Sequence, residues 1–268
     1  MKKNSTWDDV AEWWSDEAGE SGVWHQEHDI DPVMLKAIGT VRGKKVLEIG
    51  CGNGYFARML ARVGAKVTAI DVSPKFIRIA REQEQTERLG VRCYVRDAAD
   101  LKGIRSGQFD LIVSNMALMD IPRFRQAIRE ASRVVKRGGR FVFSIVHPLY
   151  SDWQHESVTY NGRRYFARIL KKYLSETADD RSHWKNGHAT VHYHRPMQSY
   201  VHALRDARLL VKDMFEVCTS RKLQHSVSRN KKIMHKLTRW YLSADDRRQK
   251  FATRREIPLF LVVESVRR

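Results

Sequence analysis

The run from Val46 to Gly54 constrains the fold more than any other part of the chain. It reads V-L-E-I-G-C-G-N-G, and its apolar residues predict a short buried strand. The alternating glycines predict a turn in which the backbone approaches a ligand closely, because a Cβ would collide with that ligand and because such a turn uses positive φ. A helix expected over residues 55–63 would aim its N-terminal amides at the same place, ready for an anionic group.

The spacing of the glycines distinguishes between two kinds of ligand-binding loop. Dinucleotide-binding loops read G-x-G-x-x-G, whereas Gly50, Gly52 and Gly54 alternate here and Glu48 precedes them. This pattern resembles motif I of the class I S-adenosylmethionine-dependent methyltransferases, E/D-x-G-x-G-x-G. A glycine loop alone is weak evidence for a family, so the rest of the chain must agree with it.

Strands and helices alternate after the loop. Residues 66–70 predict a strand that ends at Asp71, about 20 residues beyond the loop, where α/β nucleotide sites place a carboxylate on ribose hydroxyls. Ser73 and Pro74 predict the start of a helix over residues 75–89. The next expected segments are a strand over 92–96, a strand over 109–115, a helix over 123–135 that stops at Gly138 and Gly139, and a strand over 140–146. This order predicts a doubly wound α/β sheet.

Residues 44–148 resemble the core of the class I methyltransferases, in particular the small-molecule subset that includes quinone-biosynthesis enzymes. The segments that carry the resemblance are 46–54, 69–73, 97–98, 109–115 and 134–139. The resemblance implies S-adenosylmethionine as cofactor and S-adenosylhomocysteine as product. It also implies a seven-stranded, mostly parallel sheet with an antiparallel last strand, and residues 209–218 and 257–266 are expected to supply the sixth and last strands.

The resemblance assigns cofactor-binding roles by position. Asp71 would accept hydrogen bonds from ribose hydroxyls, with Val72 packed on the adenine. Asp97 would accept from the adenine amine, which is a donor; its alternative is a turn acid. Asn115 and Met116 would approach the sulfonium and its methyl group, although Asn115 could instead cap the strand end. The complete expected set is Glu48, Gly50, Cys51, Gly52, Asn53, Gly54, Asp71, Val72, Asp97, Ala98, Asn115 and Met116.

Three regions lie outside this core. Residues 1–43 are expected to form a helical cover with a helix over 7–18, residues 149–195 a lid insertion, and residues 219–255 a basic helical insertion, within a methyltransferase domain over 44–268. Aromatic residues of the first two regions could close over the substrate, or they could equally be core packing, because tryptophan is highly buried on average. The candidate lid residues are Trp13, Trp14, Trp24, Tyr150, Trp153 and Tyr193.

The formal net charge of +18 is concentrated toward the C-terminus. Residues 221–255 contain twelve Lys or Arg, opposed only by Asp245 and Asp246. Such a cluster could bind a nucleic-acid backbone, or attract an acidic substrate or an anionic surface. It could also be the solvated face of an amphipathic helix, because Ile233 and Leu237 fall at helical spacing.

A base is needed if the acceptor must lose a proton. His147 is the first candidate because it ends the predicted fifth strand and its unperturbed pKa near 6.5 suits neutral pH; its alternative is a packed loop histidine. His194 and His192 are the next candidates, with Tyr193 as an orienting hydroxyl. The segment 192–196 resembles the Y-H-R entry to the sixth helix in small-molecule methyltransferases.

Composition limits the remaining choices. The sequence has no apolar run long enough for a membrane span, no apolar leader after Met1, and no metal-binding spacing among Cys51, Cys93 and Cys218. These features predict a cytoplasmic enzyme without a metal. The leading hypothesis is methylation of a small, aromatic or anionic metabolite. An RNA or protein methyltransferase and a non-catalytic cofactor-binding regulator stay open as alternatives, and the oligomeric state is left unassigned.

Overall fold

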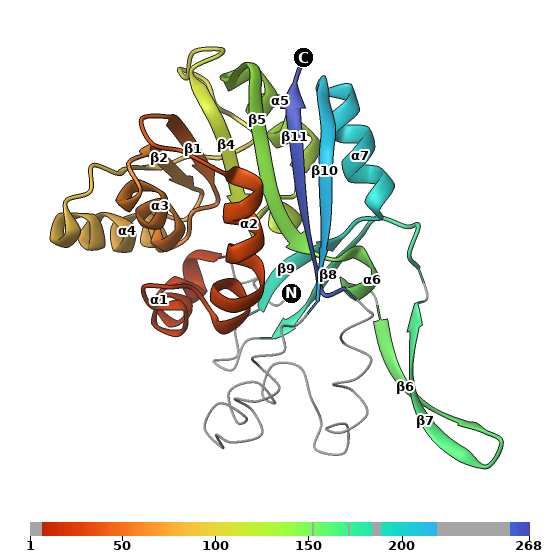
Figure 1. Ribbon diagram of the computed structural model, residues 1–268. Coiled ribbons are helices and arrows are strands. Elements are labelled where there is room, and N and C mark those ends of the chain that lie inside the picture. Colours follow the sequence, from red (N-terminus) through yellow and green to blue (C-terminus); the bar gives the residue numbers. More distant parts are fainter. Residues whose placement is uncertain (1–6, 152, 171, 184–188, 219–257) are drawn as a thin grey trace.

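A computed structural model describes residues 7–151, 153–170, 172–183, 189–218 and 258–268. The basic insertion expected over 219–255 lies outside the described residues. Figure 1 shows a central sheet with helices on both faces. No described helix is long and apolar enough to cross a membrane.

The central sheet has seven strands in the order β10-β11-β5-β4-β1-β2-β3. β11 runs antiparallel to β5 and to β10, and the other neighbours are parallel. The fold class and the placement of the last strand beside the sixth are therefore confirmed. The strands are β1 Lys45–Ile49, β2 Lys66–Asp71, β3 Arg92–Val95, β4 Phe109–Asn115, β5 Val135–Val146, β10 Leu209–Val217 and β11 Phe260–Arg267.

Two hydrophobic clusters cover the faces of the sheet, as alternation along a strand requires. In β1, Val46 belongs to one cluster, with residues of α2, α3 and α4, whereas Leu47 and Ile49 belong to the other, with α5 and α7. The helices are α1 Trp7–Ala18, α2 Asp31–Ile38, α3 Tyr55–Arg62, α4 Pro74–Glu87, α5 Phe124–Val134, α6 Pro148–Ser151 and α7 Met197–Asp206, with a π-helix at Gln26–Ile30 (η1) and a 3-10 turn at Leu118–Asp120 (η2).

The fifth strand differs from its prediction. It begins at Val135, directly after α5, and runs through Gly138 and Gly139 instead of starting after them. The glycines sit where the pairing with β4 shifts register, and Gly138 has φ 72°. A bulge in the strand, which glycine accommodates, therefore replaces the expected helix stop.

The insertion after β5 forms two hairpins. β6 Trp153–Tyr160 pairs with β7 Arg163–Leu170, and β8 Thr177–His183 pairs with β9 Ala189–His194. Figure 1 shows the β6–β7 hairpin projecting away from the sheet, whereas β8 and β9 lie below the carboxyl end of β5. The second hairpin is therefore the part of the insertion that reaches the functional edge of the sheet.

Helix α1 is attached to the start of α4. Asp8 Oδ1 accepts hydrogen bonds from Ser73 Oγ at 2.7 Å and from the Lys75 amide at 2.9 Å. Ser73 is the N-cap of α4, because its side chain accepts from the Phe76 amide. The Trp7 ring lies 6.4 Å from that of Phe76. These contacts place the N-terminal helix beside the carboxyl end of β2.

Candidate functional site

A cavity of about 520 Å³ opens at the carboxyl ends of β1, β2 and β4. Ligands of parallel α/β sheets bind at this edge. The cavity brings together most of the expected site residues, with the exceptions given below. Those that line it are Glu48, Gly50, Cys51, Gly52, Asn53, Asp71, Val72, Asp97, Ala98, Asn115, Met116, Trp14 and Tyr193. Lining residues that sequence reasoning missed are Trp7, Asp8, Gln26, Tyr55, Ser73, Phe76, Arg96, Ala117, Asp120, Ile121, Pro122, Thr190 and Val191.

Contacts with other parts of the protein restrict the conformation of the glycine loop. Gly50 has φ 70°, and a Cβ added there would lie 2.3 Å from the Cβ of Ala117. The Gly50 and Cys51 amides both donate to the Ile70 carbonyl, at 2.8 and 3.0 Å. At Gly50 the neighbouring loop after β4 is therefore itself an obstacle to a side chain. Gly54 is the N-cap of α3, has φ 77°, and does not line the cavity.

Asp71 is a buried carboxylate that holds two backbone segments. Its Oδ2 accepts from the Gly52 amide at 2.9 Å, and its Oδ1 accepts from the Ser73 amide at 2.9 Å. Burial raises the pKa of Asp71, and the two amide donors oppose that rise. Val72 beside it is 61% exposed, so an apolar surface borders the cavity next to the carboxylate.

Glu48 is a buried acid of the site with one carboxylate oxygen that is unpartnered within the described part of the chain. Its side chain is buried, and its Oε2 atom has no hydrogen-bond partner among the described residues. Desolvation raises the pKa of Glu48 well above its usual range, and the nearby Asp31 and Asp71 raise it further, against the opposing effect of Arg58. A buried acceptor without a donor costs free energy. A positively charged donor in the cavity would relieve that cost.

Asn115 belongs to a buried polar network at the end of β4. Its Nδ2 donates to Asp31 Oδ1 at 2.7 Å and to the Tyr55 hydroxyl at 2.9 Å. Its Oδ1 accepts from Ser144 Oγ at 2.7 Å. Met116, the next residue, has φ 56°, and its amide donates to Ser144 Oγ at 2.9 Å. A non-glycine residue in this region is strained, and such strain concentrates at functional sites.

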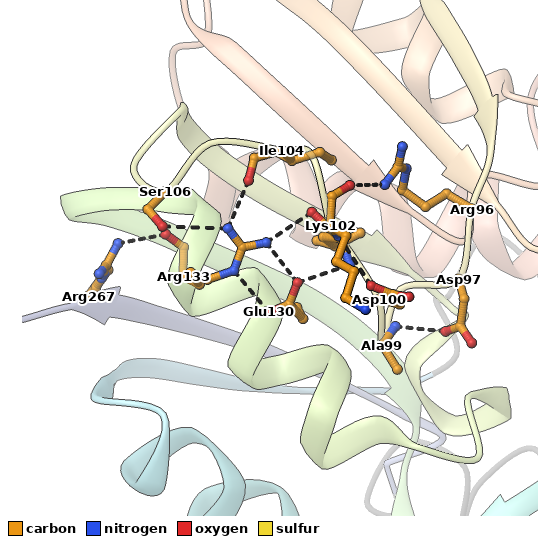
Figure 2. Close-up of polar contacts among 11 residues, drawn as sticks. Arg96, Asp97, Ala99, Asp100, Lys102, Ile104, Ser106, Glu130, Arg133 and Arg267 are labelled. Atoms are coloured by element: carbon orange, nitrogen blue, oxygen red, sulfur yellow. Dashed lines mark hydrogen bonds and ion pairs between the residues drawn. The ribbon is translucent and has the colours of Figure 1, made fainter.

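Asp97 lies on a loop that a second polar network braces, as Figure 2 shows. Its Oδ1 accepts from the Ala99 amide at 2.7 Å, and its Oδ2 pairs with Arg123 Nη2 at 2.7 Å. Arg133 donates to the carbonyls of Leu101 at 2.9 Å and Ile104 at 2.8 Å. The loop is therefore held from α5, which keeps Asp97 and Ala98 at the cavity wall.

The two histidines expected as bases do not line the cavity. His147 is buried with its Nε2 3.2 Å from Glu216 Oε1. Desolvation lowers the pKa of His147, although Glu216 opposes that shift. His194 is also buried, and its Nε2 donates to the Tyr173 carbonyl at 2.8 Å. Both imidazoles therefore bond to protein groups and lie outside the cavity lining, and their role as the base stays a prediction.

His192, the remaining candidate, contacts the cavity wall through an acid. Its Nδ1 lies 3.0 Å from Oδ1 of Asp120, and Asp120 lines the cavity. Sequence reasoning missed Asp120, which follows β4 by only a few residues. The only local signal was its place after the carboxyl end of that strand.

Only some of the expected lid residues line the cavity. Trp14 and Tyr193 line the cavity, whereas Trp13 and Trp24 do not. The Trp24 ring instead stacks on His28 at 4.4 Å between centroids. The side chains of Tyr150 and Trp153 lie outside the described part of the structure.

Part of the chain is similar in sequence to known proteins. Residues 47–143 match the family model described as a methyltransferase domain. The chain is 29% identical over 163 residues to a ubiquinone biosynthesis O-methyltransferase of Xanthomonas euvesicatoria pv. vesicatoria, a match covering 60% of this chain and 65% of that protein. The matched region is thus less than two thirds of this relative.

Solved structures show the same fold at low identity. An S-adenosylmethionine-dependent methyltransferase from Mesorhizobium loti superposes with TM-score 0.68 at 23% identity, covering 93% of this chain and 100% of that chain. Geranyl diphosphate C-methyltransferase from Streptomyces coelicolor A3(2) superposes with TM-score 0.56 at 15% identity, covering 88% of this chain and 76% of that chain. At these identities the likeness establishes the fold.

Proposed function

We propose that this chain, which belongs to the class I methyltransferases by its domain and its fold, binds S-adenosylmethionine in the cavity and transfers the methyl group to a small molecule. The observation that carries the proposal is the convergence of the glycine loop, Asp71, Asp97 and Asn115 on one cavity. These residues come from four successive strand ends, where the resemblance in sequence had assigned cofactor contacts.

The chemistry of the cavity fits the cofactor from end to end. The unpartnered Oε2 of Glu48 suits a cationic amino group, because the buried carboxylate would gain a donor and a counter-charge. Asp71 is held in place by the Gly52 and Ser73 amides and can still accept from hydroxyls. Val72 and Asp97 offer an apolar surface and an acceptor for a heteroaromatic amine.

When bound, S-adenosylmethionine supplies a methyl group on a sulfonium, so that the acceptor's lone pair forms the new bond while the carbon–sulfur pair passes to sulfur. The protein's own part is to position the reactants and to exclude water. Asn115 is fixed by Asp31, Tyr55 and Ser144, which holds the end of β4 in one geometry.

A small acceptor is supported by the walls of the same cavity. Trp14 borders it from α1, Ile121 and Pro122 from the loop after β4, and Thr190 and Tyr193 from β9. Trp14 belongs to the N-terminal cover, and Thr190 and Tyr193 belong to the insertion, the two regions we expected to close over a substrate. The relative from Xanthomonas is named as an O-methyltransferase of ubiquinone biosynthesis, which agrees with a small acceptor. The cavity's aromatic side chains favour an acceptor with an apolar or aromatic part.

Calorimetric titration tests the proposal. We expect S-adenosylmethionine and S-adenosylhomocysteine to bind and NAD to show no binding. Glu48→Gln and Asp71→Ala should each weaken binding by about tenfold or more, since each removes an interaction with a charged or hydroxyl group worth over about 1.4 kcal/mol. Asp206→Asn, an exposed carboxylate on α7, is the matched control and should leave the affinity unchanged. Absence of binding by both sulfur compounds would overturn the proposal.

A further inference from the structure

The residues that line the cavity differ in kind from those that dominate the chain's composition. The protein has a formal net charge of +18, yet the only basic side chain among the described residues that line the cavity is that of Arg96. Its guanidinium is turned to protein, since Nη1 donates to the Lys102 carbonyl (Figure 2). Acidic side chains dominate the walls instead: Asp8, Glu48, Asp71, Asp97 and Asp120.

Four of these five acids either stand at the proposed cofactor positions or accept hydrogen bonds that hold two helices together. Glu48, Asp71 and Asp97 stand where the cofactor is proposed to bind, and Asp8 is engaged by Ser73 and Lys75 at the start of α4. Asp120 is the fifth, and it is not among the cofactor positions. It lies beyond Asn115 and Met116, on η2, among the walls proposed to surround the acceptor.

Asp120 is held in a fixed orientation. Its side chain is 11% exposed, and its Oδ1 is 3.0 Å from Nδ1 of His192, whose side chain is 18% exposed. The segment that carries Asp120 is fastened by Arg195, which donates to the Ile121 carbonyl at 2.7 Å and stacks on the Phe124 and Tyr193 rings at 4.1 and 4.7 Å. An anchored carboxylate at a cavity wall can receive a proton or a hydrogen bond in a defined direction.

We infer that the methyl acceptor is a neutral or cationic compound bearing an O–H or N–H group, and that Asp120, positioned by His192, receives the proton this group loses. The inference rests on the proposed function. As the acceptor's lone pair bonds to the methyl carbon, the acceptor's proton passes to the Asp120 carboxylate, which becomes a carboxylic acid and later returns the proton to water. Charge balances, because the acceptor gains a methyl group and loses a proton.

The Asp120 carboxylate in the cavity wall gives the physical reason why a neutral or cationic acceptor is favoured. An anionic acceptor would have to shed water beside the Asp120 carboxylate, and like charges at short range repel more strongly as water is excluded. A neutral hydroxyl or amine instead gains a hydrogen bond to Asp120, and a cation gains attraction as well. The anionic metabolite that the chain's overall charge suggested is therefore disfavoured at this cavity.

Methyl-labelled S-adenosylmethionine tests the charge of the acceptor even while the acceptor is unidentified. The protein is incubated with the small-molecule fraction of an extract of its source cells, and the labelled product is passed over anion and cation exchangers at neutral pH. We expect the label to flow through both or to bind the cation exchanger. Label held by the anion exchanger, or released as methanol by mild alkali from a methyl ester, would overturn the inference. Absence of label from the product fraction would instead contradict the proposed function.

Variants assayed on that product fraction test the role of Asp120. Asp120→Asn should lower kcat by about a hundredfold or more, as loss of a general base does, while S-adenosylhomocysteine affinity stays within about twofold. His192→Ala should lower kcat less, with partial rescue by His192→Gln, which retains a donor for the carboxylate. Asp206→Asn is again the control. An unchanged kcat in Asp120→Asn, or a loss explained wholly by cofactor affinity, would contradict the assignment.

Discussion

Asn115 at the end of β4 donates a 2.7 Å hydrogen bond to Asp31, the first residue of α2. The two residues are joined further by the Tyr55 hydroxyl, which donates to Asp31 Oδ1 at 3.3 Å. Asn115 lines the cavity. The N-terminal region is therefore linked to the site through the buried Asp31 carboxylate. The protonation of Asp31 thus bears on Asn115 at the carboxyl edge of the sheet.

The first prediction concerns this carboxylate. Desolvation raises the pKa of Asp31 from 3.8 to about 7, against opposing hydrogen bonds from Asn115 and Tyr55. The pKa of Asp31 in the folded protein lies above its value in the unfolded protein. The stability that goes with the protonated Asp31 carboxyl group is therefore fully present below the unfolded pKa of 3.8 and is lost as the pH rises through about 7. Asp31→Asn removes this dependence. From about pH 5 to about pH 8, its free energy of unfolding should rise relative to wild type by about 3 kcal/mol.

Urea denaturation of both proteins at the two pH values measures this difference. Asp206→Asn, whose carboxylate is exposed, should show no such change relative to wild type. A constant difference between Asp31→Asn and wild type across this range would show that Asp31 ionises normally in the folded protein.

The second prediction compares two glycines with similar backbone conformations. Gly50 and Gly90 have φ of 70° and 83°, but a Cβ would clash with Ala117 only at Gly50, because nothing lies within 4 Å at Gly90. Both Ala variants bear the left-handed cost of about 1 kcal/mol. Gly50→Ala should lose about 2 kcal/mol more, the usual cost of overpacking. Equal losses in denaturation would mean that the Gly50–Ala117 approach does not constrain the loop.

The third prediction separates two neighbouring tryptophans of α1. Trp14 lines the cavity and Trp13 does not, although their rings lie 6.1 Å apart. Trp14→Ala should lower kcat/KM for the labelled transfer to the small-molecule fraction by about tenfold, the value of one good aromatic contact. Trp13→Ala is the matched control and should change kcat/KM by less than about threefold. Transfer assays on both variants decide, and a larger effect at Trp13 would mean that Trp14 does not contact the acceptor.

Much of the fold could be predicted from local sequence. The strands β1, β2 and β4 each contain a short apolar run that ends at a polar residue or glycine, and Asp71 and Asn115 mark two of these strand ends. Parallel topology then gathers these ends at one edge. Most of the residues that line the cavity at these strand ends could therefore be predicted from the order of the segments.

The acceptor side could not be predicted in the same way. His147 also ends a strand, but β10 and β11 reach it there, through Glu216 and the Leu259 carbonyl, which accepts from the His147 amide at 2.8 Å. His192 and Asp120 are distant in sequence and meet only because the β8–β9 hairpin returns to the sheet edge. Such pairings depend on tertiary contacts that no local pattern encodes.

Net charge was similarly uninformative about the site. Among the residues that the structure describes, Arg96 alone of the Lys and Arg side chains lines the cavity, whereas carboxylates at the strand ends line it. A global excess of one sign affects long-range attraction, while the groups within contact distance decide which ligand is stable.

The most direct test of the central claim is the destination of the methyl group. Labelled S-adenosylmethionine is incubated with the protein and a whole extract of the source cells, and the label is divided between extractable small molecules and precipitated macromolecules, with and without nuclease. We predict nuclease-resistant label among the small molecules, and its loss in Asp71→Ala. Label confined to precipitated, nuclease-sensitive material would contradict the account and identify a nucleic acid as the acceptor.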